Sequence, residues 1–153
     1  MTIEQLIKAN SPLGLPKKTL LNILYTQISV TEKFNELLKP FELSEEQFNV
    51  LRILRGQKEQ SANMCVIQER MIAKTSNTTR LVDKLLLKEL VTRNVCPNNR
   101  RKIDVTITNK GLKILAELDP KVIELETVFS SNLTLQELQI LNTLLEKYRI
   151  INN

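Results

Sequence analysis

Apolar residues recur at helical spacing along most of the chain. The first such stretch covers about residues 17–38 and follows a loop at 11–16 that is rich in Pro and Gly. It predicts a helix that Pro40 ends. The apolar side chains of this helix lie on more than one face. A helix of this kind needs two neighbours, and in so short a chain the second is expected from another subunit.

Start and stop signals define the helices that follow. Ser44 and Gln47 stand at the first and fourth positions of a capping box, and Gly56 marks the end of the helix that they begin. Two further helices are predicted, a short one at about 63–71 and a longer one at about 75–88. About three residues separate these two helices, so the pair is a candidate helix-turn-helix.

The clearest strand pattern comes next, at residues 102–108, where apolar and polar side chains alternate. Residues 90–95 provide a partner strand, and the sequence Pro-Asn-Asn at 97–99 favours a turn between the two. The two segments therefore predict a β-hairpin with a basic tip.

Two long helices are predicted after the hairpin. Thr108 caps the first of them, which must kink or break near Pro120 because proline lacks the backbone N–H. Thr134 and Glu137 form a second capping box at the start of the last helix. The order of helix, helix, helix-turn-helix, hairpin and long helices predicts a mainly α (α+β) fold, a winged helix-turn-helix flanked by helical arms.

The length of 153 residues is enough for one structural domain. Within it, we assign residues 1–40 to an N-terminal dimerisation arm and 41–110 to the winged helix-turn-helix DNA-binding region. Residues 111–153 are assigned to C-terminal dimerisation helices. The N- and C-terminal helices are thus expected to form one dimerisation region.

The composition excludes most enzyme sites. The chain has no His and only three Gly. Histidine bases, His-activated nucleophiles, imidazole metal ligands and Gly-rich phosphate loops are therefore all excluded. We expect no enzymatic activity, no cofactor and no bound metal.

The cysteines and the hydropathy pattern indicate the compartment. Cys65 and Cys96 lie 31 residues apart with no further candidate ligands, which fits reduced thiols in the cytoplasm. We expect each to be an inert packing residue, with a redox-sensitive thiol as the alternative. No stretch resembles a signal peptide or approaches the ~18 apolar residues that span a bilayer. We therefore expect a soluble, cytoplasmic protein with no membrane partner.

The positive charge is concentrated in one segment. The whole chain has a formal net charge of +5. Residues 72–113 hold ten basic and three acidic residues, a net charge of +7, whereas the remainder carries −2. A basic helix-turn-helix and hairpin have the electrostatic pattern expected of a protein that binds double-stranded DNA. The alternative is a solvated face that happens to be basic.

The periodicity of the helix at 75–88 indicates which side chains face DNA. Thr78, Leu81, Val82 and Leu85 fall on one face and are expected in the core. Arg80 on the opposite face can form the bidentate pair with guanine.

Two residues of this segment, Asn77 and Asp83, each have more than one possible partner. Asn77 can pair with adenine or serve as a second cap near the helix start. An outward Asp83 is unusual on a DNA-binding face unless it pairs with Lys84, Arg80 or a cytosine amine.

The predicted DNA contacts come from the helix-turn-helix and from the β-hairpin. Arg100 and Arg101 at the hairpin tip are expected to enter the adjacent minor groove, whose narrow A·T stretches attract arginine. The full set of predicted contacts is Lys74, Ser76, Asn77, Thr79, Arg80, Lys84, Arg100, Arg101 and Lys102.

At these residues the chain resembles the MarR-type transcriptional regulators, a winged-helix family. The wing of that family reads Asp-Arg-Arg, three positions, then Val-x-Leu-Thr-x-Lys-Gly. The sequence NNRRKIDVTITNKG at 98–111 keeps most of this pattern. The segments TRLVDKL at 79–85 and KELVTR at 88–93 are also similar to the family. Two positions depart from it, since Asn99 replaces the acid of the wing and Glu89 replaces a glycine that favours a left-handed conformation.

The resemblance implies a homodimer that places two recognition helices in successive major grooves of a pseudo-palindromic operator, about 10 bp apart. It also implies a repressor that releases DNA when a small-molecule effector, often an aromatic anion, binds between the arms and the winged helix. The identity of such an effector is not encoded in any motif of the sequence. The alternative is a winged helix that docks other proteins without binding specific DNA, because a fold does not fix a function.

Overall fold

The computed structural model describes the backbone of residues 1–58, 61–96 and 99–150, and their side chains except at 95, 96 and 99–102. The chain divides into two units, Met1–Leu115 and Ala116–Asn153. The first contains α1 (Ile3–Leu6), α2 (Leu15–Leu38), the 3-10 helix η1 (Lys39–Phe41), α3 (Glu45–Arg55), β1 (Ala62–Asn63), α4 (Met64–Arg70), α5 (Thr78–Leu87), β2 (Val91–Cys96) and β3 (Asn99–Ile107). Helix α6 (Asn109–Ser130) starts in the first unit, and α7 (Leu135–Tyr148) belongs to the second.

The predicted helix starts are confirmed at both capping boxes. The hydroxyl of Ser44 accepts a hydrogen bond from the Gln47 amide at 3.2 Å, and Gln47 Oε1 accepts one from the Ser44 amide at 3.1 Å. Thr134 and Glu137 make the same exchange at the start of α7. Gly56 ends α3 as predicted. These local hydrogen bonds satisfy backbone donors that the first helical turn leaves without partners.

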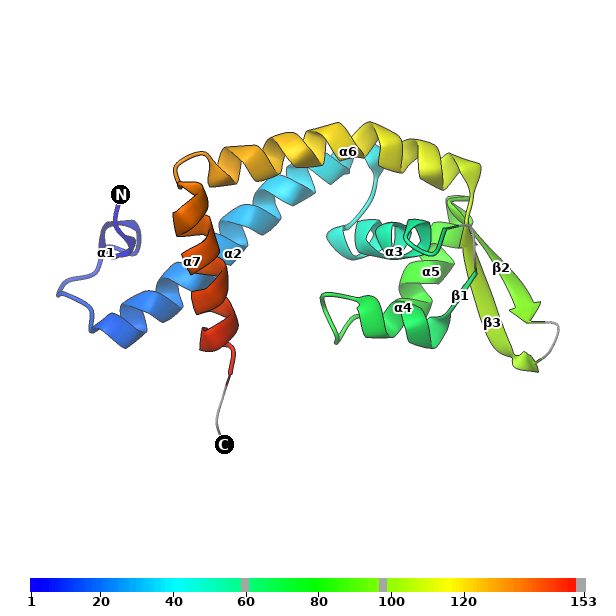
Figure 1. The fold of residues 1–153 in the computed structure, drawn as a ribbon, viewed down its shortest axis with the longest axis horizontal. Coiled ribbons are helices and arrows are strands. Elements are labelled where there is room, and N and C mark those ends of the chain that lie inside the picture. Colours follow the sequence, from blue (N-terminus) through cyan, green and yellow to red (C-terminus); the bar gives the residue numbers. More distant parts are fainter. Residues whose placement is uncertain (59–60, 97–98, 151–153) are drawn as a thin grey trace. The chain divides into compact units, whose positions relative to one another are not determined.

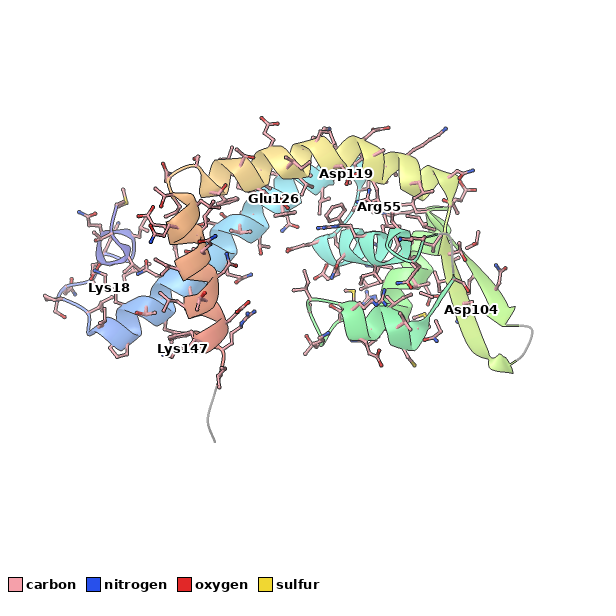
Figure 2. The ribbon with its side chains drawn as sticks, viewed as in Figure 1. Lys18, Arg55, Asp104, Asp119, Glu126 and Lys147 are labelled. Carbon is pink, nitrogen blue, oxygen red and sulfur yellow. The ribbon has the colours of Figure 1, made fainter. Side chains whose placement is uncertain are left out.

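The pairing of the two predicted hairpin strands is confirmed, and both belong to a three-stranded antiparallel sheet with the order β1-β3-β2 (Figure 1). Residues 97 and 98 of the predicted turn lie outside the described residues. The core residue Val105 of β3 pairs with Ala62 on one side and with Arg93 on the other. Strand β1 has no signal in the sequence, because two residues are too few to show alternation. The short helix α1 was also missed. It begins at a capping box of its own at Thr2, and its Glu4 pairs with Lys18 of α2 at 2.9 Å. Lys18 is labelled in Figure 2.

A hydrophobic core joins α3, α4 and α5 to the sheet. Helices α3 and α4 both pack on β3, and α5 packs on α3 and β2 (Figure 1). The side chains that are at most 2% exposed here are Val50, Leu51, Leu54, Ala62, Ile67, Met71, Val82, Leu85, Leu90, Val91 and Val105. Full burial of one such aliphatic side chain stabilises the fold by about 1.5–3 kcal/mol. This core therefore holds α5 in a fixed orientation next to the hairpin.

The sequence predicts a kink or a break in α6 near Pro120. The helix runs without a break from Asn109 to Ser130, with Pro120 inside it, so of these two alternatives the break is absent. Proline removes one i to i−4 hydrogen bond, and the rest of the hydrogen-bond ladder continues on both sides.

The expectation that Cys65 is a packing residue was wrong, since its side chain is exposed on α4. Buried Ile67 lies two residues further along this helix, which places Cys65 about 200° away around the axis. The side chain of Cys96 lies outside the described residues. Within the described part of the chain, no helix combines the length and apolarity needed to cross a membrane.

Candidate nucleic-acid interface

The turn between α4 and α5 is held by hydrogen bonds from the side chains of Gln68 and Lys74 and from its own backbone. Gln68 Nε2 donates to the carbonyl of Lys74 at 2.8 Å, and the Lys74 amine donates to the carbonyl of Glu69. The Ser76 amide donates to the carbonyl of Ala73 at 3.1 Å. Both Lys74 and Ser76 are predicted DNA contacts. Lys74 is exposed and Ser76 is half-buried. The turn therefore presents the start of α5 in a defined conformation.

Asn77 caps α5, which begins at Thr78 rather than at the predicted residue 75. Its Oδ1 accepts a hydrogen bond from the Arg80 amide at 3.0 Å. Of the two alternatives for Asn77, the cap is the one found in the structure. The buried Thr78 hydroxyl donates to Gln68 Oε1 and ties the first turn of α5 to α4.

The two faces of α5 are divided as the periodicity predicted. Thr78, Val82 and Leu85 are buried, and Leu81 is half-buried. The opposite face exposes four polar residues, Thr79, Arg80, Asp83 and Lys84. Because the core fixes the buried face, this polar face must point to solvent, where a DNA duplex can approach it.

Asp83 is paired with a residue that the sequence analysis did not consider. Its Oδ1 lies 3.1 Å from Nη1 of Arg93, on strand β2. The three candidates had been Lys84, Arg80 and a cytosine amine. The signal that could have identified Arg93 was the outward carboxylate itself, which requires a cation near it on a basic surface.

The C-terminal end of α5 is fastened to the start of α6. Glu89 has a φ of 59°, in the left-handed region, at the position where the family has glycine. Lys110 Nζ donates to the carbonyl of Lys88 at 2.9 Å and pairs with Glu89 Oε2 at 3.2 Å. The Thr108 hydroxyl donates to the carbonyl of Glu89 at 2.9 Å. These contacts offset the backbone cost of a left-handed residue that is not glycine.

The wing is described only in part. The backbone of Arg100, Arg101 and Lys102 forms the beginning of β3, but their side chains lie outside the described residues. Half-buried Asp104 lies further along β3, where its backbone pairs with that of Asn94 (Figure 2).

An open groove of about 660 Å³ lies at the C-terminal end of α5. Its lining residues are Asn35, Lys39, Glu42, Leu43, Ser44, Gln47, Lys84, Leu87 and Lys88. Beside it, burial and the neighbouring Glu46 raise the pKa of Glu45, in the first turn of α3. Among the lining residues, Lys39, Lys84 and Lys88 carry positive charge, and Glu42 carries negative charge.

The fold and this surface define the class of protein. A winged helix-turn-helix with an exposed polar face on its second helix is the architecture of a DNA-binding transcription factor. The family model of the MarR family matches residues 43–103.

Individual proteins give the same assignment. The MarR transcription factor from Planctomyces limnophilus is 31% identical, with a TM-score of 0.69 over 89% of this chain and 98% of that one. A mutant of MarR from E. coli, complexed with operator DNA, is 25% identical, with a TM-score of 0.74 over 89% and 95% of the two chains. MhqR of Bacillus subtilis is 29% identical over 92 residues, 60% of this chain and 62% of MhqR. This chain belongs to the MarR family, whose members are transcriptional regulators and not enzymes.

Proposed function

We propose that the chain acts as a homodimer that binds a pseudo-palindromic operator and represses transcription. In this proposal, α5 of each subunit enters the major groove and the wing lies at the adjacent minor groove. The observation that carries the proposal is the exposed polar face of α5, with Thr79, Arg80 and Lys84 presented by a capped and packed helix.

The residues have different roles in this complex. Arg80 lies near the N-terminus of α5, the end that reaches base edges, and its guanidinium suits guanine O6 and N7. Thr79 and Ser76 are short enough to contact bases or phosphates nearby, and Lys74 and Lys84 supply charge to phosphates. Arg100, Arg101 and Lys102 are proposed to contact the minor groove and its flanking phosphates.

Exposed apolar side chains on the arms support the homodimer. In α2 these are Leu15, Leu20, Leu24, Tyr25 and Ile28, and in α7 they are Leu135, Ile140, Leu141, Leu144, Leu145 and Tyr148. Apolar surface of this extent on a helix is unfavourable in water and marks an interaction surface. A second copy of the chain covers it in our proposal, and repression follows because the dimer blocks its site to other proteins.

The groove supports the effector part of the proposal. Lys84 lines the groove and also belongs to the outward face of α5. A small aromatic anion held by Lys39 and Lys84 would compete with DNA phosphates for the Lys84 amine. We expect millimolar benzoate to release bound DNA, and Lys39→Gln to reduce this response without weakening DNA binding in its absence. Anisotropy of labelled DNA measures both, and equal release from the two proteins would contradict the assignment of the groove.

A gel-shift titration on DNA flanking the protein's own gene tests the central part of the proposal. We expect binding that weakens steeply with salt, since each neutralised phosphate adds about 0.9 to the log–log slope. A scrambled duplex of equal length is the control, and it should bind at least ~10³-fold more weakly at physiological salt. Absent or salt-independent binding would favour the alternative of a protein-docking module.

A further inference from the structure

The Asp83–Arg93 pair connects the two elements that approach DNA. Asp83 belongs to the outward face of α5, and Arg93 stands near the start of β2, the first strand of the wing. Their Oδ1 and Nη1 atoms are 3.1 Å apart, and the side chains are 52% and 37% exposed. The pair is therefore formed at the surface, between the recognition helix and the hairpin.

Its place in the fold relates it to the DNA backbone. If α5 occupies a major groove and the wing lies at the adjacent minor groove, the sugar-phosphate backbone that separates the two grooves must run between these elements. Arg93 and Asp83 lie where α5 and the wing meet. A carboxylate alone at this point would be repelled by phosphate, so Asp83 is compatible with DNA only when a cation neutralises it.

We propose that Arg93 binds a phosphate of this intervening backbone strand and that Asp83 positions its guanidinium. This inference rests on the proposed DNA binding by α5 and the wing. A guanidinium has five N–H donors in a rigid plane, so it can hold a carboxylate at one edge and a phosphate at another. Because Asp83 holds the group in place before DNA arrives, less side-chain entropy is lost on binding.

The pair has a consequence for specificity as well as for affinity. The ion pair with Asp83 fixes the guanidinium of Arg93 in one position between α5 and β2. Arg93 can then contact a phosphate only where the DNA backbone passes through that position. Without the carboxylate, the Arg93 side chain is free to reach a phosphate of any duplex, whatever its sequence. The loss of Asp83 also removes one negative charge near the DNA. Asp83 therefore lowers binding to unspecific DNA more than it affects the operator.

Four variants separate these roles: Arg93→Gln, Arg93→Lys, Asp83→Asn and the double variant of Arg93→Gln with Asp83→Asn. Lys33→Gln is the control, because Lys33 also pairs with a carboxylate, that of Glu36 at 2.8 Å, and belongs to α2 rather than to α5 or β2. It changes the net charge by the same amount as Arg93→Gln. Dissociation constants are measured by anisotropy for a duplex protected in a footprint and for a scrambled duplex, at three salt concentrations.

We expect Arg93→Gln to weaken operator binding about 10-fold and to reduce the salt slope by about 1.8 for a dimer, 0.9 for each lost phosphate contact. Arg93→Lys should keep the slope but lower the ratio of operator to scrambled affinity, since lysine lacks the planar donor set. Asp83→Asn should tighten binding to the scrambled duplex about 3-fold or more and leave the operator unimproved. In the Arg93→Gln background, Asp83→Asn should leave the ratio of operator to scrambled affinity unchanged, because Asp83 then has no guanidinium to position.

Two results would overturn the proposal. The first is a salt slope in Arg93→Gln that matches that of Lys33→Gln. The second is an Asp83→Asn variant that tightens both duplexes equally in both backgrounds, which is the behaviour of a charge without a positioning role. The wild-type titration tests the proposed DNA-binding function separately. If the wild-type protein binds neither duplex, that function is contradicted before any variant is compared.

Discussion

Gly111 stands where the first turn of α6 touches Leu90, in the segment between α5 and β2, and its missing side chain permits this contact. A Cβ atom there would lie 2.5 Å from the Leu90 carbonyl oxygen and 2.8 Å from Ile107 Cγ1. One of these atoms is backbone and the other belongs to β3, so neither can move easily. The glycine in the family's wing motif therefore has a packing reason in this chain.

We predict that Gly111→Ala lowers the free energy of unfolding by about 1–3 kcal/mol, the usual cost of overpacking. Gly14→Ala is the matched control, because no described atom lies within 4 Å of the Cβ position at Gly14. Urea unfolding followed by circular dichroism measures both. Equal stability of the two variants would show that the joint between α5 and α6 is looser than described.

Arg80 and Lys84 are expected to differ in how their loss affects DNA binding. Arg80→Ala should cost about 1–3 kcal/mol on the operator and little on a scrambled duplex, because a base contact carries sequence information. Lys84→Ala should weaken both duplexes by a similar factor, because a phosphate contact carries none. Anisotropy titrations on the two duplexes compare these effects. The same loss on both duplexes for Arg80→Ala would remove Arg80 from the base contacts.

At this scale, the sequence predicted the polar face of α5 but not the partner of Asp83. The face follows from a local period of 3.6 residues, which any helical segment displays. The Asp83–Arg93 pair depends on how a helix packs on a strand, and no local pattern records that distance. Glu89 is intermediate, since its left-handed position followed from the family pattern while its contact with Lys110 required the fold.

Helix α5 begins at Asn77, whose side chain caps it. Substitutions at Asn77 can distinguish this structural role from a contact with a DNA base. Asn77→Ala should destabilise the protein by about 1 kcal/mol, because it removes the acceptor for the Arg80 amide. Asn77→Ser should keep both stability and operator affinity, since serine is an equally good cap. Thermal unfolding and anisotropy test this together. A stable Asn77→Ser variant with weakened operator binding would instead identify an adenine contact.

Helix α7 depends on a capping box that contains a titrating group. Glu137 Oε2 accepts hydrogen bonds from the Thr134 amide and hydroxyl, both at 2.8 Å, and these bonds lower the pKa of Glu137. A carboxylate whose pKa is lowered on folding stabilises the folded state above its unfolded value, about 4.3, and this contribution is lost as the pH falls through the folded pKa.

We therefore expect wild type to be more stable than Glu137→Gln at pH 7, and the difference to shrink below about pH 4. Thermal unfolding of the two proteins at pH 7 and pH 3 measures it. A difference that stays constant with pH would mean that the charge of Glu137 plays no part in the cap.

The elements that the sequence predicted are those with local signals. The capping boxes at Ser44 and Thr134 and the alternation at 102–108 each placed an element correctly. Strand β1 was missed because it exists only through its pairing with β3. The start of α5 was placed three residues early, because the turn before it is held by Gln68, a residue of the preceding helix. Of the two alternatives at Pro120, a kink or a break, the break is absent because one lost hydrogen bond does not end a long helix.

The whole molecule, as proposed, requires a second copy of the chain. The α7 side chains of Leu141 and Leu145 are 42% and 37% exposed in the single chain. Leu141→Glu should produce a monomer by light scattering, because it buries a charge in the apolar interface. Operator affinity should fall with it, since one subunit makes half of the contacts. Gln139→Glu adds the same charge at an exposed polar position of α7 and should remain a dimer. Equal masses for the two variants would exclude α7 from the interface.

A hydroxyl-radical footprint on the DNA flanking the protein's own gene tests the central claim most directly. The claim is that two α5 helices of a homodimer enter successive major grooves. It predicts two protected blocks related by two-fold symmetry, with centres about 10 bp apart. A single block, protection spread evenly along the duplex, or no protection would contradict it.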